Sequence, residues 1–171
     1  MIYFSEYSSP AGILCMESSG SELTALYFKE NAQIKSSKSL ILKDDLSLFM
    51  LIREWLDRYF AGENSPIEGL PLNLEGSDFR KLVWKYLLEI PYGEVVTYGE
   101  LAKRVAKDLN KEKMSSRAIG NAVKNNPIAI IIPCHRVVSK AGIGGYNAGV
   151  ERKILLLRLE KIAKNNFNKI F

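Results

Sequence analysis

The chain has 171 residues, of which 47% are hydrophobic and 25% are charged, and its formal net charge is +5. Its length suffices for one domain or two small ones with a real core. No apolar run approaches the roughly 20 residues of a membrane helix, and the N-terminus lacks a signal-peptide pattern, so we expect a cytoplasmic protein with no membrane partner. The two cysteines, Cys15 and Cys134, and one histidine are too few for a disulfide framework or a conventional zinc site.

The charge is distributed unevenly along the chain. Residues 1–77 carry 6 Lys and Arg against 11 Asp and Glu, whereas residues 78–171 carry 18 against 8. A basic half joined to an acidic half indicates that a polyanion docks on the C-terminal part, most simply nucleic acid. A solvated basic surface without a partner is the alternative.

The first 60 residues predict a small sheet followed by one helix. Three β-prone runs, separated by turns rich in Ser, Pro and Gly, predict antiparallel strands. The runs are Ile2–Tyr7, Gly12–Glu17 and Leu23–Lys29. Residues 30–44 are polar, and a helix is expected to begin at Asp44 or Asp45. Its apolar face recurs at helical spacing and consists of Leu48, Phe49, Ile52, Trp55, Leu56, Tyr59 and Phe60.

A boundary between two domains is predicted at about residues 61–77. Pro66 follows the end of the helix, Pro71 keeps the next segment extended, and the charge reverses at the same place. We therefore expect an N-terminal domain over residues 1–77, including this linker, and a basic domain over residues 78–171.

The basic domain is expected to open with a helix that Ser77 or Asp78 caps and Pro91 ends. The expected apolar positions of this helix are Phe79, Leu82, Val83, Tyr86, Leu87 and Ile90.

Two further short helices follow. Thr97 and Glu100 form a capping-box sequence that opens one of them, and Ser115 or Ser116 caps the other, which runs from Arg117 to Lys124. Two short helices in a basic context indicate a helix-turn-helix, whose second helix reads DNA.

Residues 130–138 place Cys134 beside the only histidine, His135, between two β-branched runs and behind Pro133. A thiol attacks only as thiolate, so it needs a base or a positive field, and His135 and Arg136 are candidates. Adjacent residues in a strand point to opposite faces, so either the chain leaves strand geometry at Pro133 or a water bridges the two side chains. A small buried thiol in a core strand is the alternative.

Several motifs of the second half closely resemble the active-site signature of the 6-O-alkylguanine-DNA alkyltransferases, or methylated-DNA-protein-cysteine methyltransferases. They are Pro91-Tyr92-Gly93, Val96-Thr97-Tyr98, Arg117-Ala118, Asn126-Pro127, Pro133-Cys134-His135-Arg136-Val137, Gly144-Gly145-Tyr146 and Leu156-Leu157-Arg158-Leu159-Glu160. The resemblance implies an α+β fold, with a small antiparallel-sheet, ribonuclease-H-like N-terminal domain. A mostly helical winged helix-turn-helix domain follows and carries the active-site cysteine.

The resemblance implies roles for five residues in the reaction. Cys134 would take the alkyl group. His135 would deprotonate the Cys134 thiol through a water, and Glu160 would orient the imidazole of His135. Asn126 would brace the turns around Cys134, and Tyr98 would hydrogen-bond the flipped base and help to protonate the leaving guanine. Without the motifs, Glu160 is an exposed helix-end charge, Asn126 a helix stop and Tyr98 a packed aromatic residue.

DNA contacts are expected on or near the second helix of the pair. By resemblance, Arg117 would fill the space that the flipped nucleotide leaves, and an ordinary surface arginine is the alternative. The other expected DNA contacts are Tyr98, Ser115, Ser116, Asn121, Lys124 and Arg136.

The resemblance also implies a base pocket. Val137 would offer its backbone carbonyl to the guanine amino group, and Gly145, Tyr146 and Asn147 would belong to a loop whose glycines let backbone amides approach the alkylated oxygen. Many relatives have serine at the position of Asn147. Some relatives hold an N-terminal zinc with Cys and His ligands that residues 1–77 lack, so we expect no metal and no cofactor.

The implied activity is direct-reversal repair of duplex DNA by a monomer at the nucleoid. One displacement would move the alkyl group from 6-O-alkylguanine, and also from 4-O-alkylthymine, to Cys134 in an irreversible, stoichiometric step after base flipping. Three alternatives stay open. A cysteine hydrolase gives no reason for the basic helices, a transcription factor leaves Cys134, His135 and Glu160 unused, and a non-catalytic lesion binder does not need the cysteine that is present.

Overall fold

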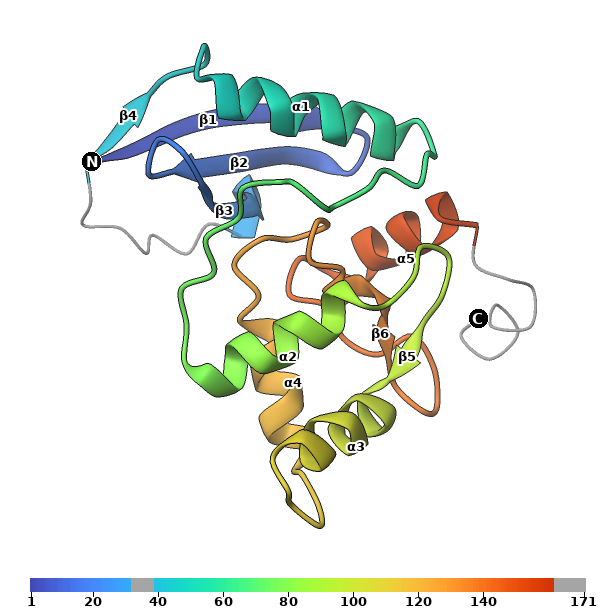
Figure 1. Ribbon diagram of the computed structural model, residues 1–171. Helices are drawn as coiled ribbons and strands as arrows, with labels where there is room; N and C mark the ends of the chain where they lie inside the picture. Colours follow the sequence, from blue (N-terminus) through green and yellow to red (C-terminus); the bar gives the residue numbers. More distant parts are fainter. Residues whose placement is uncertain (32–38, 162–171) are drawn as a thin grey trace. The chain divides into compact units, whose positions relative to one another are not determined.

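The structure is a computed structural model that describes residues 1–31 and 39–161, and these form two compact units. Among the described residues, the first unit comprises Met1–Glu75 with Pro127–Ala129, and the second comprises Gly76–Asn126 and residues 130–161. The first is a sheet with one long helix and the second is mostly helical, which confirms the α+β class (Figure 1). The division at residues 77 and 78 stays a prediction.

The sheet of the first unit has the strand order β3-β2-β1-β4. The strands β1 (Ile2–Ser9), β2 (Gly12–Ser18) and β3 (Leu23–Phe28) are antiparallel, as predicted. The edge strand β4 (Leu40–Leu42) pairs parallel to β1, so the prediction of a purely antiparallel sheet was wrong there. β4 has only three residues and lies within residues 30–44, which the sequence analysis interpreted as polar, so its apolar run was too short to predict a strand. The rest of that stretch, residues 32–38, lies outside the described residues.

Helix α1 (Ser47–Phe60) packs against β1 and lies along the sheet (Figure 1). Leu46 precedes it without a side-chain cap, so the expected start at Asp44 or Asp45 was wrong. The Asp44 carboxylate instead accepts hydrogen bonds from Ser5 and from Arg53, whose Nη2 lies 3.2 Å away. The buried face confirms six of the seven predicted apolar positions, namely Leu48, Phe49, Ile52, Trp55, Leu56 and Tyr59.

A short return segment, Pro127–Ala129, belongs to the first unit. The Leu26 amide donates to the Pro127 carbonyl at 3.0 Å, and the Ala129 amide donates to the Leu26 carbonyl at 2.8 Å. The chain is thus held on β3 a few residues before it reaches Cys134.

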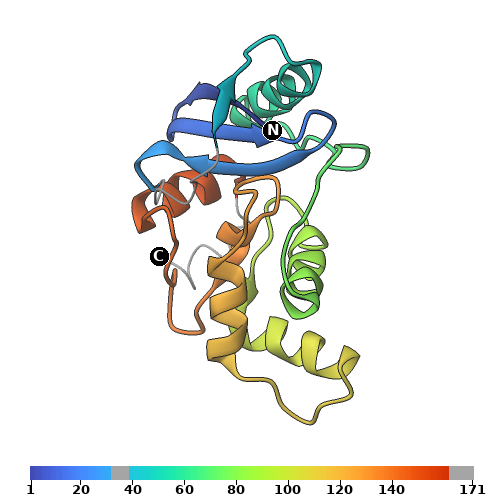
Figure 2. The same ribbon diagram turned by 90° about the vertical axis from the view of Figure 1, so that its left-hand side faces the viewer.

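Three helices form the body of the second unit. They are α2 (Asp78–Leu88), α3 (Tyr98–Asp108) and α4 (Ser116–Lys124), and they pack on one another. All three were predicted, with caps at Ser77, Thr97 and Ser115. The indole of Trp84 donates to the Ala122 carbonyl at 2.9 Å and links α2 to α4. Figure 2 shows α3 and α4 as neighbours joined by one loop.

The rest of the second unit carries β5 (Val96–Thr97), β6 (Val137–Val138) and α5 (Val150–Leu159). β5 and β6 pair in parallel, which differs from the antiparallel hairpin of a usual wing. The helix pair is therefore present, and its assignment to a winged helix-turn-helix stays a prediction.

Candidate active site

Cys134 lies in a single 3-10 turn, Cys134–Arg136, and not in a strand. The isoleucines before it form turns, and Ile130 has a φ of 70°, a conformation that costs a β-branched residue free energy. The Asn126 side-chain amide donates to the Ile132 carbonyl at 2.8 Å, and so braces the turn as expected for this residue. The chain therefore leaves strand geometry around Pro133, the first of the two solutions that the sequence left open.

His135 and Glu160 meet although they are 25 residues apart. His135 Nε2 donates to Glu160 Oε1 at 2.6 Å, and both side chains are fully buried. Burial lowers the pKa of His135, and Glu160 opposes that shift. Burial raises the pKa of Glu160, but His135 and Arg136 outweigh it and hold the pKa well below its usual range. A neutral imidazole beside an ionised carboxylate is a suitable general base.

Arg136 was expected to contact DNA, but its side chain does not face solvent. Only 5% of it is exposed, its Nε and Nη2 donate to the two Glu160 oxygens at 2.8 and 3.1 Å, and its Nη1 donates to the Ile90 carbonyl at 2.6 Å. The expected DNA contact of Arg136 is therefore wrong. A buried carboxylate needs a compensating charge, and Arg136 supplies it to Glu160.

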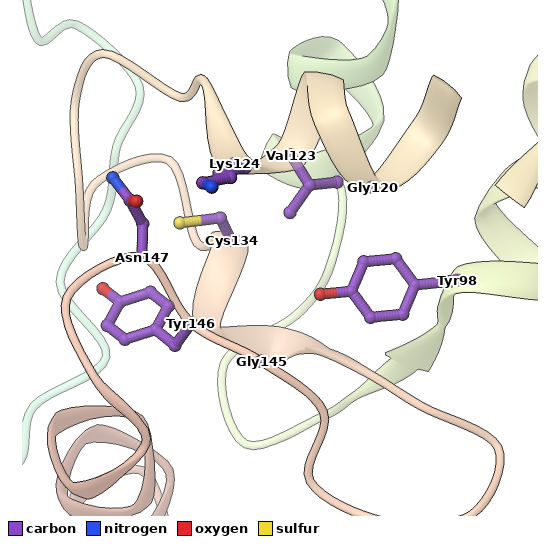
Figure 3. Close-up of a pocket in the computed structure, with 8 residues that line it drawn as sticks. All are labelled: Tyr98, Gly120, Val123, Lys124, Cys134, Gly145, Tyr146 and Asn147. Carbon is purple, nitrogen blue, oxygen red and sulfur yellow. The ribbon is translucent and has the colours of Figure 1, made fainter. Parts of the chain in front are cut away.

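A cavity of about 410 Å³ opens beside Cys134, which is within the size range of small-molecule sites. Its lining comes from α3, α4, the cysteine turn and the glycine loop, residues 141–149. The lining residues are Tyr98, Gly120, Val123, Lys124, Cys134, Gly145, Tyr146 and Asn147. In Figure 3 the Tyr98 hydroxyl points toward the middle of the cavity, across from Tyr146 and Asn147.

Opposing effects set the acidity of the Cys134 thiol. Burial raises its pKa, whereas Asn126, Lys153 and Tyr146 favour the thiolate. Burial and the neighbouring Cys134 raise the pKa of the Tyr98 and Tyr146 phenols. The phenols therefore stay protonated at neutral pH and can act as hydrogen-bond donors.

The expected DNA-contacting side chains lie together at α4. Arg117, Asn121 and Lys124 are exposed, and so are Ser115 and Ser116 at its start. The opposite face of the helix buries Ile119, Ala122 and Val123. This leaves one polar, basic face of α4 available to a ligand.

Lys153 is the main residue that the sequence analysis missed. It lies on α5 with 0% exposure, and its Nζ donates to the Val137 carbonyl at 2.6 Å and to the Gly145 carbonyl at 2.9 Å. Val137 itself is buried and does not line the cavity. Lys153 precedes Leu156 and Leu157 by three and four positions, so helical spacing is the one sequence signal that could have placed it on the buried face of α5. Gly120 and Val123 were also missed as pocket residues.

Two general features bear on the class of the protein. None of the helices in residues 1–31 and 39–161 has the length and apolar character that crossing a membrane requires. The same residues contain no cluster of three or more side chains suited to a metal ion. A buried Cys-His-Glu set beside a cavity, next to a helix with an exposed basic face, has the features of a protein that uses a cysteine on a nucleic-acid substrate.

Comparison with known proteins identifies the family. The 6-O-methylguanine DNA methyltransferase family is matched twice, by its ribonuclease-like domain over residues 2–74 and by its DNA binding domain over residues 78–162. The chain is 42% identical to the methylated-DNA--protein-cysteine methyltransferase of Haemophilus influenzae over 162 residues, covering 94% of this chain and 87% of the relative. The relative from Metallosphaera sedula is 38% identical and covers 94% of both.

Solved structures agree. The Mycobacterium tuberculosis OGT in complex with DNA superposes with a TM-score of 0.81 at 39% identity, over 93% of this chain and 92% of that chain. The chain therefore belongs to the 6-O-methylguanine DNA methyltransferase family. It is a DNA-binding repair enzyme that transfers an alkyl group from DNA to a cysteine of its own.

Proposed function

We propose that Cys134 is the alkyl acceptor and that the cavity beside it takes the damaged base, extruded from duplex DNA. The observation that carries this assignment is the position of Cys134 on the cavity wall. The next residue in the chain, His135, is buried and hydrogen-bonded to Glu160. Cys15 lies in a strand of the other unit and has no such neighbours.

The proton path follows from the imidazole geometry. His135 Nε2 donates to Glu160, so the thiol proton passes through a water to Nδ1, the other nitrogen of the ring. The thiolate then attacks the alkyl carbon. The S–C bond forms as the C–O bond breaks, and guanine leaves with a proton that Tyr98 donates. The step needs no cofactor, since nothing in it is oxidised or reduced.

The reaction ends with one thioether on each molecule. A thioether lacks the leaving chemistry of an ester or a disulfide, so the step is irreversible and stoichiometric. The same displacement suits 4-O-alkylthymine, which presents an equivalent alkylated oxygen.

Base recognition is assigned to the cavity lining and to the carbonyl of Val137, which lies three residues after Cys134 in the chain. The Val137 carbonyl has two lone pairs, so it can accept from the guanine amino group while it accepts from Lys153. Gly145, Tyr146 and Asn147 line the other side, where backbone amides approach the alkylated oxygen.

Helix α4 and the residues at its start make the contacts with DNA. Arg117 enters the duplex in place of the extruded nucleotide, while Ser115, Ser116, Asn121 and Lys124 contact the phosphate backbone. Their exposure on one helix face supports this arrangement.

We further propose that the protein acts as a monomer in the cytoplasm, at the nucleoid, and that residues 1–77 and 78–171 are its two domains.

The test follows the DNA rather than the protein. A duplex with one 6-O-methylguanine is incubated with increasing amounts of protein, and the bases are quantified after hydrolysis. Guanine should replace 6-O-methylguanine in a one-to-one ratio with protein and then stop. Free 6-O-methylguanine released from the duplex would indicate a glycosylase, and turnover beyond one equivalent would contradict a stoichiometric acceptor.

A further inference from the structure

Lys153 is a buried cation that pairs with no carboxylate among the described residues. Its Nζ donates to two carbonyl oxygens, those of Val137 on β6 and Gly145 in the glycine loop. None of the ion pairs in the described part of the chain involves it. Burying an ammonium costs free energy that two neutral hydrogen bonds do not fully offset, so its retention needs another reason.

The glycine loop closes tightly on this ammonium. A Cβ at Gly144 would lie 3.5 Å from Lys153 Nζ and 3.1 Å from the Ser139 amide, and Gly144 has a φ of +73°. Only glycine fits there without strain, so the loop is built to pass close to the lysine. Of the two residues whose carbonyls Lys153 holds, Gly145 lines the cavity, and Val137 lies three residues after Cys134, which also lines it.

The other charged groups around the thiol are already compensated or stay neutral. Glu160, the C-cap of α5, binds both His135 and Arg136, while the Arg152 guanidinium on α5 donates to the Ala148 carbonyl at 3.1 Å. Tyr146 from the loop and Tyr98 from α3 are protonated phenols. This leaves Lys153 as the charge that acts on Cys134 from the described residues around it.

We propose that Lys153 is a positioning residue of the transfer reaction, in which its ammonium ties β6 to the glycine loop and its charge stabilises the Cys134 thiolate. The inference rests on the proposed role of Cys134 as the acceptor. The same ammonium group thus holds the glycine loop in place and stabilises the thiolate that attacks.

The alkylated protein should then differ from the free protein at this lysine. Burial lowers the pKa of Lys153 to about 8, and Cys134 opposes that shift. A thioether cannot become an anion, so alkylation removes the opposing influence and makes the ammonium easier to deprotonate. A neutral amine is a weaker donor, so the glycine loop is held less firmly in the product.

The experiment measures the thiol without DNA, so that it does not depend on base flipping. In a Cys15→Ser background, the rate of Cys134 alkylation by iodoacetamide is recorded against pH for Lys153→Met, Lys153→Arg and the control Lys81→Met, an exposed lysine on α2. The Lys153→Met profile should move up by about one pH unit, which makes the reaction about tenfold slower at neutral pH. Lys153→Arg should restore most of the rate, and Lys81→Met should match the parent.

Superimposable profiles for Lys153→Met and the parent would overturn the proposal. If Lys153→Met does not fold, the parent itself provides the test, through side-chain NMR of lysines labelled at Cε. The Lys153 midpoint should fall after iodoacetamide blocks Cys134, and an unchanged or higher midpoint would contradict the coupling. Alkyl transfer from DNA is measured separately, so a parent that shows the shift but transfers nothing would refute the role of Cys134 as acceptor and leave only the coupling between Lys153 and the thiol.

Discussion

The two cysteines of the chain are both buried but lie in opposite electrostatic surroundings. Cys15 is 3% exposed in β2, where burial and the carboxylates of Glu6 and Glu17 raise its pKa to about 11. Cys134 is 8% exposed, and there Lys153 and the polar groups of Asn126 and Tyr146 work against burial. The contrast teaches that burial alone does not decide the fate of a thiol. The charges facing it determine whether the thiolate is accessible.

Removing each cysteine in turn should separate the two sites completely. Cys134→Ser should abolish alkyl transfer from a duplex with 6-O-methylguanine, because a hydroxyl at neutral pH is a far weaker nucleophile than a thiolate. Cys15→Ser should transfer at the parental rate, since that thiol sits among carboxylates. The measurement is the loss of labelled methyl from the DNA. Activity retained by Cys134→Ser would mean that the acceptor is elsewhere.

The buried network behind Cys134 should be far more sensitive than an exposed pair of the same type. Glu160→Gln leaves the buried Arg136 without its counter-charge and should lower the free energy of unfolding by about 3–5 kcal/mol. The matched control is Glu63→Gln, whose partner Arg58 is half exposed, and it should leave stability unchanged within error. Urea unfolding monitored by circular dichroism measures both. Equal effects would show that the Glu160 network contributes no more than a surface pair.

Stability should also depend on pH through Glu160. Its pKa is held well below the usual range in the folded protein, whereas in the unfolded chain it is about 4.3. The stabilisation is therefore fully present above about pH 5 and is lost as the pH falls from there toward the folded pKa. The difference in unfolding free energy between the parent and Glu160→Gln should be constant from pH 5 to 7 and shrink in more acidic buffers. A difference that grows on acidification would contradict this sign.

The smallest change concerns Cys15. Glu6→Gln removes one carboxylate near that thiol and releases Lys29 from its ion pair with Glu6, so the pKa of Cys15 should fall while Cys134 is unaffected. Thiol reactivity against pH in a Cys134→Ser background measures it. An unchanged midpoint would show that the Glu6–Lys29 pair does not contribute to the raised pKa of Cys15.

Much of the local structure could be predicted from the sequence. Helical spacing and caps are local signals, so the buried face of α1 and the capped starts of α2, α3 and α4 could be predicted. The motifs around Cys134 pointed to His135, Glu160 and Asn126 together. These residues then proved to be neighbours in space. The strand β4 was missed because its pairing with β1 is not encoded in its own three residues.

Arg136 and Lys153 show where the prediction from sequence stopped. Both are cations in a basic half of the chain, and composition favours exposed positions for such residues. Whether a basic side chain reaches solvent depends on which distant groups it meets, here Glu160 for Arg136 and the two pocket carbonyls for Lys153. Those partners become neighbours only when the cysteine turn, the glycine loop and α5 pack together.

The assignment of Cys134 can be tested by peptide mapping of the protein after reaction. The parent is incubated with an excess of duplex carrying 6-O-methylguanine, digested, and examined by tandem mass spectrometry. We expect the peptide containing Cys134 to gain the mass of one CH2 in every molecule that has reacted, and the peptide containing Cys15 to keep its original mass. A methyl group on Cys15 or on any other side chain, with Cys134 unmodified, would contradict the proposed active site.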